Sequence, residues 1–152
     1  MAVPRRLLVV KVHGMGDSVL IRSLVEHFRR RDPPCKIGVL AGPATRDVLT
    51  MGSNFDLHGY HQGTLGLAAI ARSFRAIRAC HYEAALNFEQ GSMAGTAFIR
   101  ALGIPVHAGF VPLSSDHKAA MLTHPPRFRE ADSMWESFTR LVRLADADFP
   151  AR

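Results

Sequence analysis

Short hydrophobic runs alternate with longer amphipathic segments along the whole chain. Five runs have the length and the branched residues of strands; they cover residues 7–12, 36–41, 55–58, 84–88 and 106–110. The segments between and after them repeat apolar residues every three or four positions, as helices do. Helices are expected after residues 13–17 and over 44–51, 65–79, 93–102 and 130–145.

The first and the last of these helices show the pattern most clearly. In the first, Leu20, Leu24 and Phe28 recur every four residues, and the Asp-Pro-Pro segment at 32–34 ends the helix. The last carries Trp135 and Phe138 on an apolar stripe, which predicts that both are core residues. The polar, proline-containing segment 112–127 is expected to be a long loop.

Strands that alternate with helices, several of them apolar throughout, favour a parallel sheet covered on both faces. We therefore expect one α/β domain over residues 1–152, a doubly wound, five-stranded Rossmann-like sheet of order 3-2-1-4-5 with right-handed crossovers. Ligands of such sheets bind outside the carboxyl ends of the strands, near the switch point. This topology places the turn at 13–18 beside the turn at 89–92.

Composition and charge narrow the classes of partner. The 152 residues carry 19 Lys and Arg against 13 Asp and Glu, a formal charge of +6, and only three of the cations are lysines. Arginine suits bidentate contacts with phosphate or carboxylate, on a substrate or an anionic membrane surface. No RNA-binding aromatic signature is present, so nucleic acid is not an expected partner.

Two further features of the sequence bear on the compartment. Cys35 and Cys80 form no CxxC pair, which excludes a disulfide framework and a zinc ribbon. The apolar run at 7–10 is too short for a signal sequence or a membrane span. We therefore expect a cytoplasmic protein.

The turn His13-Gly14-Met15-Gly16-Asp17-Ser18 is the main candidate site. Its two glycines allow a tight turn and a close ligand approach at an electropositive helix start. Val19 stands where a dinucleotide fingerprint has its third glycine, and no Walker-type Gly-Lys-Ser/Thr follows. Asp17 either caps the helix or accepts a proton from a substrate hydroxyl as a general base.

Other candidate residues lie on neighbouring segments. Glu89 and Gln90 lie in the turn at 89–92, beside the turn at 13–18, and could bind sugar hydroxyls. Alternatively, this segment could simply begin the next helix, with Ser92 as its cap. Lys118 could reach an anionic acceptor from its loop. The helix arginines could meet acceptor phosphates or an anionic lipid surface, or form a solvated helix face; they are Arg72, Arg75 and Arg78.

No metal site is expected from the histidine pattern. The candidates have no Cys, Asp or Glu at ligand spacing, so surface or loop positions are predicted for them; they are His58, His61, His117 and His124.

Several segments together resemble the family-nine glycosyltransferases, typified by ADP-heptose:lipopolysaccharide heptosyltransferases. The most specific is K-x-x-G-M-G-D within VVKVHGMGDSVL, and the resemblance extends over nearly the whole chain. It continues through KIGVLAGPATRDVL, HYEAALNFEQGSMAGTAFIRALGIP, HAGF and DSMWESFTRLVRLAD. The sequence departs from the family at His13, where a small or polar residue is usual, and at Asn87, where an acidic residue is common.

The resemblance implies the N-terminal, acceptor-binding half of an inverting GT-B enzyme, with Asp17 as the general base. Further acceptor contacts are expected from Lys11, His13, Gly14, Met15, Gly16, Ser18, Glu89, Gln90, Arg72 and Arg75. No cofactor is expected: the co-substrate is a nucleotide-sugar, held by a C-terminal domain absent from these residues or by another polypeptide. Without that half, the chain is expected to be inactive.

The implied task is transfer of heptose or another sugar to a lipopolysaccharide core or similar glycan. This would be lipopolysaccharide biosynthesis, by a cytoplasmic, peripheral protein at the inner membrane face. The alternative is a non-catalytic, single-domain module that binds a glycan or a protein. A severed half-enzyme would expose an apolar patch at its interface, whereas a binding module would have a self-contained surface.

Overall fold

The computed structural model describes residues 5–31, 35–52, 54–59, 66–90, 92–112, 116–127 and 132–148, and confirms the expected sheet. All neighbouring strands pair in parallel, in the order β3-β2-β1-β4-β5. The strands are β1 (Arg6–Lys11), β2 (Lys36–Ala41), β3 (Asp56–Gly59), β4 (Ala84–Asn87) and β5 (Val106–Gly109). β1 and β4 are adjacent although two strands separate them in sequence, so the switch point lies between them, as expected.

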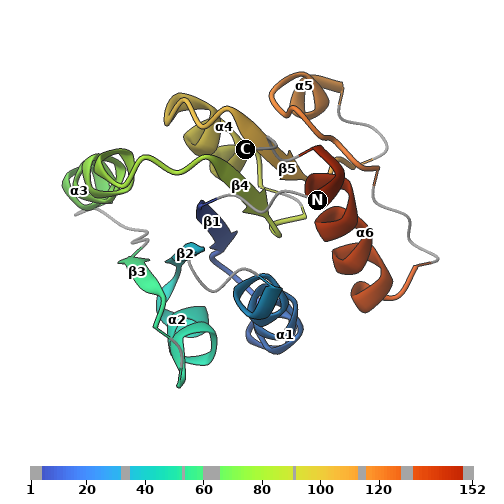
Figure 1. The fold of residues 1–152 in the computed structure, drawn as a ribbon. Helices are drawn as coiled ribbons and strands as arrows, with labels where there is room; N and C mark the ends of the chain where they lie inside the picture. The colour runs from blue at the N-terminus through green and yellow to red at the C-terminus, as the bar shows by residue number, and fades with distance from the viewer. Residues whose placement is uncertain are drawn as a thin grey trace.

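Helices cover both faces of the sheet (Figure 1). They are α1 (Met15–Arg31), α2 (Pro43–Thr50), α3 (Gly66–Ala79), α4 (Met93–Ala101), α5 (Asp116–Ala120) and α6 (Met134–Asp148). Helices α1, α2 and α6 pack on one face, and α3 and α4 on the other. Helices α1 to α4 each follow a strand of a parallel sheet, so their N-terminal ends lie toward the edge where the strands end. Helix α6 follows α5, and its first residue, Met134, contacts Gln90 in the loop after β4, so it begins near the same edge.

Alternation along β1 divides the core between the two faces. Leu7 and Val9 pack with the residues of α1, α2 and α6, whereas Leu8 and Val10 pack with those of α3 and α4. All four side chains are fully buried. A central strand buried on both faces reads as a continuous apolar run, which explains why β1 was evident from the sequence.

The segment predicted as a long loop is more ordered than its composition suggested. It contains the short helix α5, after which the chain returns along β5. The Gly109 amide donates to the His124 carbonyl at 3.2 Å, and the Val111 amide to the Pro126 carbonyl at 3.1 Å. These bonds cover the outer edge of β5. Backbone pairing of this kind leaves no hydrophobic period, so the sequence pattern missed it.

Helix α6 begins at Met134 rather than at residue 130. Ser133 and Glu136 form a capping box: Ser133 donates its amide to the Glu136 carboxylate at 2.8 Å, and the Glu136 amide donates to Ser133 Oγ at 3.3 Å. The hydrogen bonds from Ser133 also lower the pKa of the Glu136 carboxyl. The helix start is therefore fixed by a local Ser-x-x-Glu signal.

Two predictions of burial were wrong. Trp135 is 46% exposed on α6, whereas Phe138 on the same helix is fully buried. His58 is buried at the end of β3, where its Nε2 lies 2.8 Å from the Tyr82 hydroxyl. That partner satisfies the buried ring, and its position across the sheet could not be read from spacing. His61 lies outside the described residues.

None of the described helices is both long enough and apolar enough to cross a membrane.

Candidate functional site

The Gly14 turn joins the end of β1 to the start of α1. Gly14 has φ +84°, a left-handed conformation that glycine adopts without strain. Helix α1 then begins at Met15, and Gly16 and Asp17 lie in its first turn. Ser18 is fully buried and donates from Oγ to the Gly14 carbonyl at 3.0 Å. Ser18 therefore stabilises the turn instead of facing a ligand.

Asp17 projects from this turn and is held by Lys11. Lys11 Nζ lies 3.2 Å from Asp17 Oδ2, and the Asp17 side chain is 31% exposed. Within the described part of the chain, no backbone amide donates to the Asp17 carboxylate. The structure thus places Asp17 inside the first helical turn as the acceptor of a lysine, and not at the capping position.

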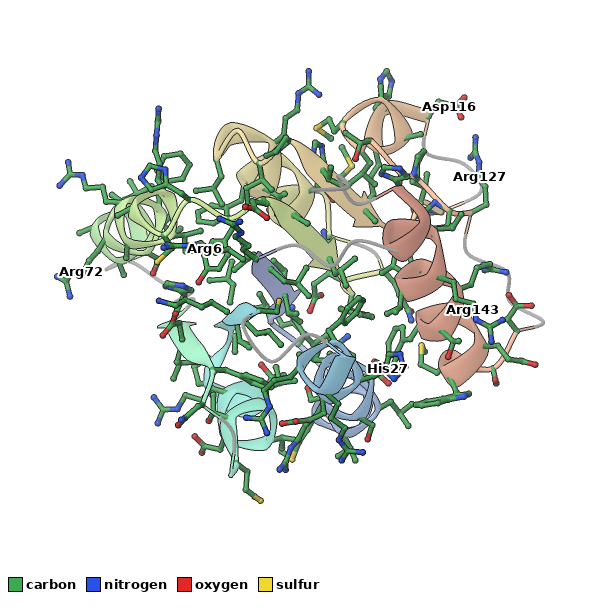
Figure 2. The ribbon with its side chains drawn as sticks, in the orientation of Figure 1. Arg6, His27, Arg72, Asp116, Arg127 and Arg143 are labelled. Carbon is green, nitrogen blue, oxygen red and sulfur yellow. The ribbon has the colours of Figure 1, made fainter. Side chains whose placement is uncertain are left out.

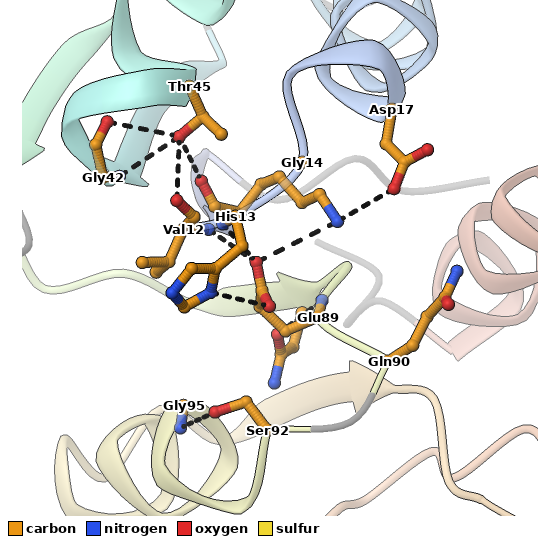
Figure 3. A network of polar contacts seen from close by, with 12 residues as sticks. Val12, His13, Gly14, Asp17, Gly42, Thr45, Glu89, Gln90, Ser92 and Gly95 are labelled. Atoms are coloured by element: carbon orange, nitrogen blue, oxygen red, sulfur yellow. Dashed lines mark hydrogen bonds and ion pairs between the residues drawn. The ribbon is translucent and has the colours of Figure 1, made fainter.

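Glu89 fastens the end of β1 to the loop after β4 (Figure 3). Its Oε1 accepts the amides of Val12 at 2.7 Å and His13 at 2.8 Å, and its Oε2 lies 3.3 Å from His13 Nδ1. Lys11 Nζ lies 4.0 Å from the same Oε1. Lys11 therefore stands between two carboxylates, and its charge offsets both.

Glu89 is 7% exposed, and protein groups occupy both of its carboxylate oxygens. We expected this side chain to contact sugar hydroxyls, but the structure commits it to the backbone of the turn. Sequence reasoning put Glu89 at the correct edge of the sheet. It could not show that the carboxylate would find amide partners within the protein.

Thr45 and Gly42 support the same strand end and were missed by the sequence analysis. Thr45 is fully buried and donates from Oγ1 to the Lys11 carbonyl at 2.8 Å. Gly42 approaches β1 so closely that an added Cβ would lie 2.4 Å from the Val12 carbonyl oxygen. The Gly-Pro pair that opens α2 was visible in the sequence, but its contact with β1 depends on the fold.

The loop after β4 is held mainly by side chains. Asn87 is fully buried and accepts the Glu89 amide at 3.0 Å through Oδ1. Ser92 caps α4 by accepting the Gly95 amide at 3.2 Å, which is the role that the sequence suggested for it. Gln90 Nε2 lies 2.6 Å from Met134 Sδ, which links this loop to the start of α6. Gly91 lies outside the described residues.

Lys118 binds the loop after β4 and does not face solvent. Its side chain is buried, and Nζ lies 3.3 Å from the Glu89 carbonyl and 3.0 Å from the Gln90 carbonyl. Burial lowers the pKa of the Lys118 amine, and the nearby Glu89 charge opposes that shift. The expectation that Lys118 reaches an acceptor from an open loop was wrong, because α5 turns it inward.

The candidate residues therefore divide into an accessible group and a buried support. His13, Gly14, Met15 and Gly16 are exposed and Asp17 is half-buried, whereas Lys11, Ser18 and Glu89 are buried. A small pocket opens beside them on the α4 side. Its lining includes His13, Glu89, Ser92 and Phe98, and Asp17 is not among its residues.

The arginines of α3 stand apart from this network. Arg72 and Arg75 are exposed, and Figure 2 shows Arg72 extending from α3 away from the sheet. No contact of the described residues connects either arginine to the Gly14 turn. The structure thus brings together the residues of the β1 and β4 ends, but not those of α3.

The described residues contain no group of three or more His, Cys, Asp or Glu side chains that could hold a metal ion.

The fold and this edge of the sheet define a class of protein domain. A five-stranded parallel sheet with helices on both faces is Rossmann-like, and it matches the N-terminal half of the GT-B fold. No protein-family model and no curated protein matches the chain in sequence.

Among solved structures, the chain is similar to heptosyltransferases. Escherichia coli heptosyltransferase WaaC, solved with ADP-2-deoxy-2-fluoro heptose, superposes with a TM-score of 0.76 at 14% identity over 97% of this chain and 50% of that one. E. coli ADP-heptose lps heptosyltransferase II gives 0.70 at 18% identity over 90% and 40%. A glycosyl transferase family 9 protein from Veillonella parvula gives 0.73 at 16% identity over 92% and 40%.

These likenesses establish the fold. The chain spans about half or less of the length of the structures that it matches. The resemblance seen in the K-x-x-G-M-G-D segment and the shared fold thus point to the same set of proteins by separate routes.

Proposed function

We propose that this chain is the acceptor-binding half of an inverting, family-nine-type glycosyltransferase with Asp17 as its general base. The acceptor is a glycan or glycolipid such as a lipopolysaccharide core, and the donor is a nucleotide-sugar carrying heptose or another sugar. The reaction needs no further cofactor in this proposal. Two of the similar solved structures are of E. coli heptosyltransferase WaaC, one with ADP-2-deoxy-2-fluoro heptose and one with ADP, and these ligands support this choice of substrates.

The observation that carries the proposal is the environment of Asp17. Its carboxylate lies at the carboxyl edge of the sheet, part of it is open to solvent, and its partner is a buried lysine rather than helix amides. Ligands of doubly wound sheets bind at this edge. A carboxylate placed there can approach an incoming hydroxyl to within hydrogen-bonding distance.

The proposed chemistry is a single displacement. Asp17 accepts the proton of the acceptor hydroxyl, the oxygen attacks the anomeric carbon of the donor, and the bond to the nucleoside diphosphate breaks with its electron pair on the leaving phosphate. Attack opposite to the leaving group inverts the anomeric configuration. Lys11 holds Asp17 at its Oδ2, which leaves Oδ1 to meet the hydroxyl.

We assign the donor to a second, nucleotide-sugar-binding half outside these 152 residues. Exposed hydrophobic side chains support the assignment. Among the exposed hydrophobic side chains of the described residues, Met15 and Met93 begin helices at the edge that carries Asp17, Val19 follows in α1, and Trp135 lies in the first turn of α6. Exposed apolar groups around a polar site are typical of a surface that meets another protein surface.

We further propose that Arg72 and Arg75 serve the acceptor or its surroundings. Both side chains are exposed on α3, and this helix contains no acidic residue. Guanidinium groups suit phosphates of a glycolipid or an anionic membrane surface. In this proposal, the protein is cytoplasmic and acts at the inner membrane face in lipopolysaccharide biosynthesis.

Sugar transfer by the completed enzyme tests the function. The chain is joined to a nucleotide-sugar-binding half, and calorimetry first establishes that the joined protein binds ADP-heptose. It is then incubated with ADP-heptose and a deacylated lipopolysaccharide core, and NMR identifies the anomeric configuration of the product. We expect transfer with inversion. Binding of both ligands without transfer would instead favour the non-catalytic binding module.

A further inference from the structure

A chain of contacts runs from the buried amine of α5 to the candidate base. Lys118 Nζ donates to the Glu89 and Gln90 carbonyls at 3.3 and 3.0 Å. The Glu89 carboxylate accepts the Val12 and His13 amides, at 2.7 and 2.8 Å. These amides precede the left-handed Gly14, after which α1 presents Asp17. Segments far apart in sequence are thereby tied to one turn.

The carbonyls that Lys118 binds belong to the residues that carry this connection. Glu89 reaches back to β1 from a short loop in which Asn87 fixes the Glu89 amide. Lys118 fixes the other end of the same residue, its carbonyl. With both ends of the Glu89 peptide unit held, the carboxylate has little freedom to leave the Val12 and His13 amides.

A merely space-filling role does not account for a lysine at this position. The side chain is 1% exposed, and burial of an ammonium group is unfavourable unless polar partners replace water. Methionine would fill a similar volume without that cost, as buried ion pairs can often be replaced by apolar groups. What lysine adds is a charged donor directed at two consecutive carbonyls.

We propose that Lys118 is a positioning residue that holds Glu89 against the Gly14 turn and so sets the place of Asp17. Lys118 has no access to substrate, so it acts through Glu89 and not by contact. The expected effect of Lys118 on catalysis rests on the proposed function, whereas its effect on the Gly14 turn can be measured in this chain alone.

The anchorage of α5 makes Lys118 suited to this role. The chain after α5 pairs with β5, through His124 to Gly109 and His107, and the Thr123 hydroxyl accepts the His107 amide at 2.8 Å. α5 is therefore attached to the sheet independently of the β4 loop. Lys118 thereby connects the β5 edge of the sheet to the loop after β4, which lies at the switch point.

Amide hydrogen exchange of the Lys118→Met variant tests the proposal. We expect exchange at the Val12 and His13 amides to accelerate by about tenfold or more, because their bond to Glu89 loosens. Exchange at the amides of Leu8 and Val10 should stay within about twofold of wild type, because β1 remains paired. Lys36→Met, the same change at an exposed lysine, is the matched control and should leave all four amides unchanged.

Unchanged exchange at Val12 and His13 in a folded Lys118→Met variant would overturn the proposal. So would acceleration that is equal at Leu8 and Val10, since that would indicate general destabilisation. Where the methionine variant does not fold, Lys118→Gln replaces it, because its amide retains a donor. An intermediate acceleration confined to Val12 and His13 supports the proposal, and wild-type exchange contradicts it.

Kinetics of the joined enzyme separate this proposal from the proposed function. Misplacement of the base should lower kcat by about tenfold or more in Lys118→Met, with little change in KM for the nucleotide-sugar. Transfer that survives Asp17→Asn would contradict the proposed function while leaving the exchange result valid. Wild-type exchange and kcat in Lys118→Met, with Asp17→Asn inactive, would contradict only the role of Lys118.

Discussion

At the scale of single residues, the Gly14 turn depends on a conformation that few side chains tolerate. The two glycines of the motif are not equivalent: Gly14 has positive φ, whereas Gly16 lies in α1 with no atom within 4 Å of an added Cβ. A Cβ at Gly14 would also lie 3.2 Å from Asp17 Oδ2. The sequence predicted that both glycines belong to the turn, but Gly16 lies in the first turn of α1, and of the two only Gly14 adopts a conformation that favours glycine.

Alanine substitutions distinguish these two positions. Gly14→Ala should lower the free energy of unfolding by about 1–2 kcal/mol, because an L-residue is strained in the left-handed region. Gly16→Ala, the matched control, should raise it by about 0.5–1 kcal/mol, because alanine favours the helix. Urea denaturation of both variants measures these changes. Equal effects of the two substitutions would contradict the assigned conformations.

Buried His58 predicts a dependence of stability on pH. Burial lowers its pKa below the ordinary value of 6.5, and the charge of Asp56 partly opposes that shift. At pH values below 6.5, the unfolded chain binds a proton at His58 more readily than the folded chain does. The free energy of unfolding should therefore fall as the pH decreases. Urea denaturation at about pH 7.5 and 5.5 should show a larger loss for wild type than for His58→Gln. Equal losses would show that His58 does not contribute.

At the scale of elements, α6 shows where hydrophobic pattern succeeds and where it fails. Phe138 packs against Phe88 and Phe110, with ring centroids 5.1 and 5.9 Å away, whereas Trp135 lies on the outer side. Both residues fit an apolar stripe at helical spacing. The pattern located the helix, but the neighbours that cover each residue come from strands distant in sequence.

Truncation of these two aromatic residues tests that division. Phe138→Ala should lower the free energy of unfolding by about 3–5 kcal/mol, because it leaves a cavity between α6 and the sheet. Trp135→Ala should lower it by less than about 1 kcal/mol, because the side chain is partly in solvent. Thermal or urea denaturation gives both values. A larger loss for Trp135→Ala would contradict the packing of α6.

At the scale of the whole molecule, the fold was more predictable than its site. Continuous apolar strands separated by helices determine a parallel sheet, and the order of that sheet followed from topology rules that hold across such folds. These rules also placed residues 13–18 beside residues 89–92. The contacts between them rest on single polar side chains such as Glu89, Thr45 and Lys118, whose partners have no periodic signature.

The distribution of exposed apolar side chains adds a molecular-scale argument. A self-contained binding module does not require exposed side chains such as Met15, Val19 and Met93 on the helices that begin at the edge carrying Asp17. The proposed half-enzyme does, since a second domain must close over that edge to bring the donor to the base. The positions of these three side chains agree with the catalytic proposal.

Sugar transfer by Asp17→Asn measures the central claim most directly. The substitution keeps the shape of the side chain but removes its capacity to accept a proton, and the joined enzyme should lose roughly 100- to 10,000-fold in kcat. Asp47→Asn, at an exposed position on α2, is the matched control and should transfer at the wild-type rate. Loss of transfer with unchanged folding and donor binding supports Asp17 as the base. Wild-type transfer by Asp17→Asn would contradict it.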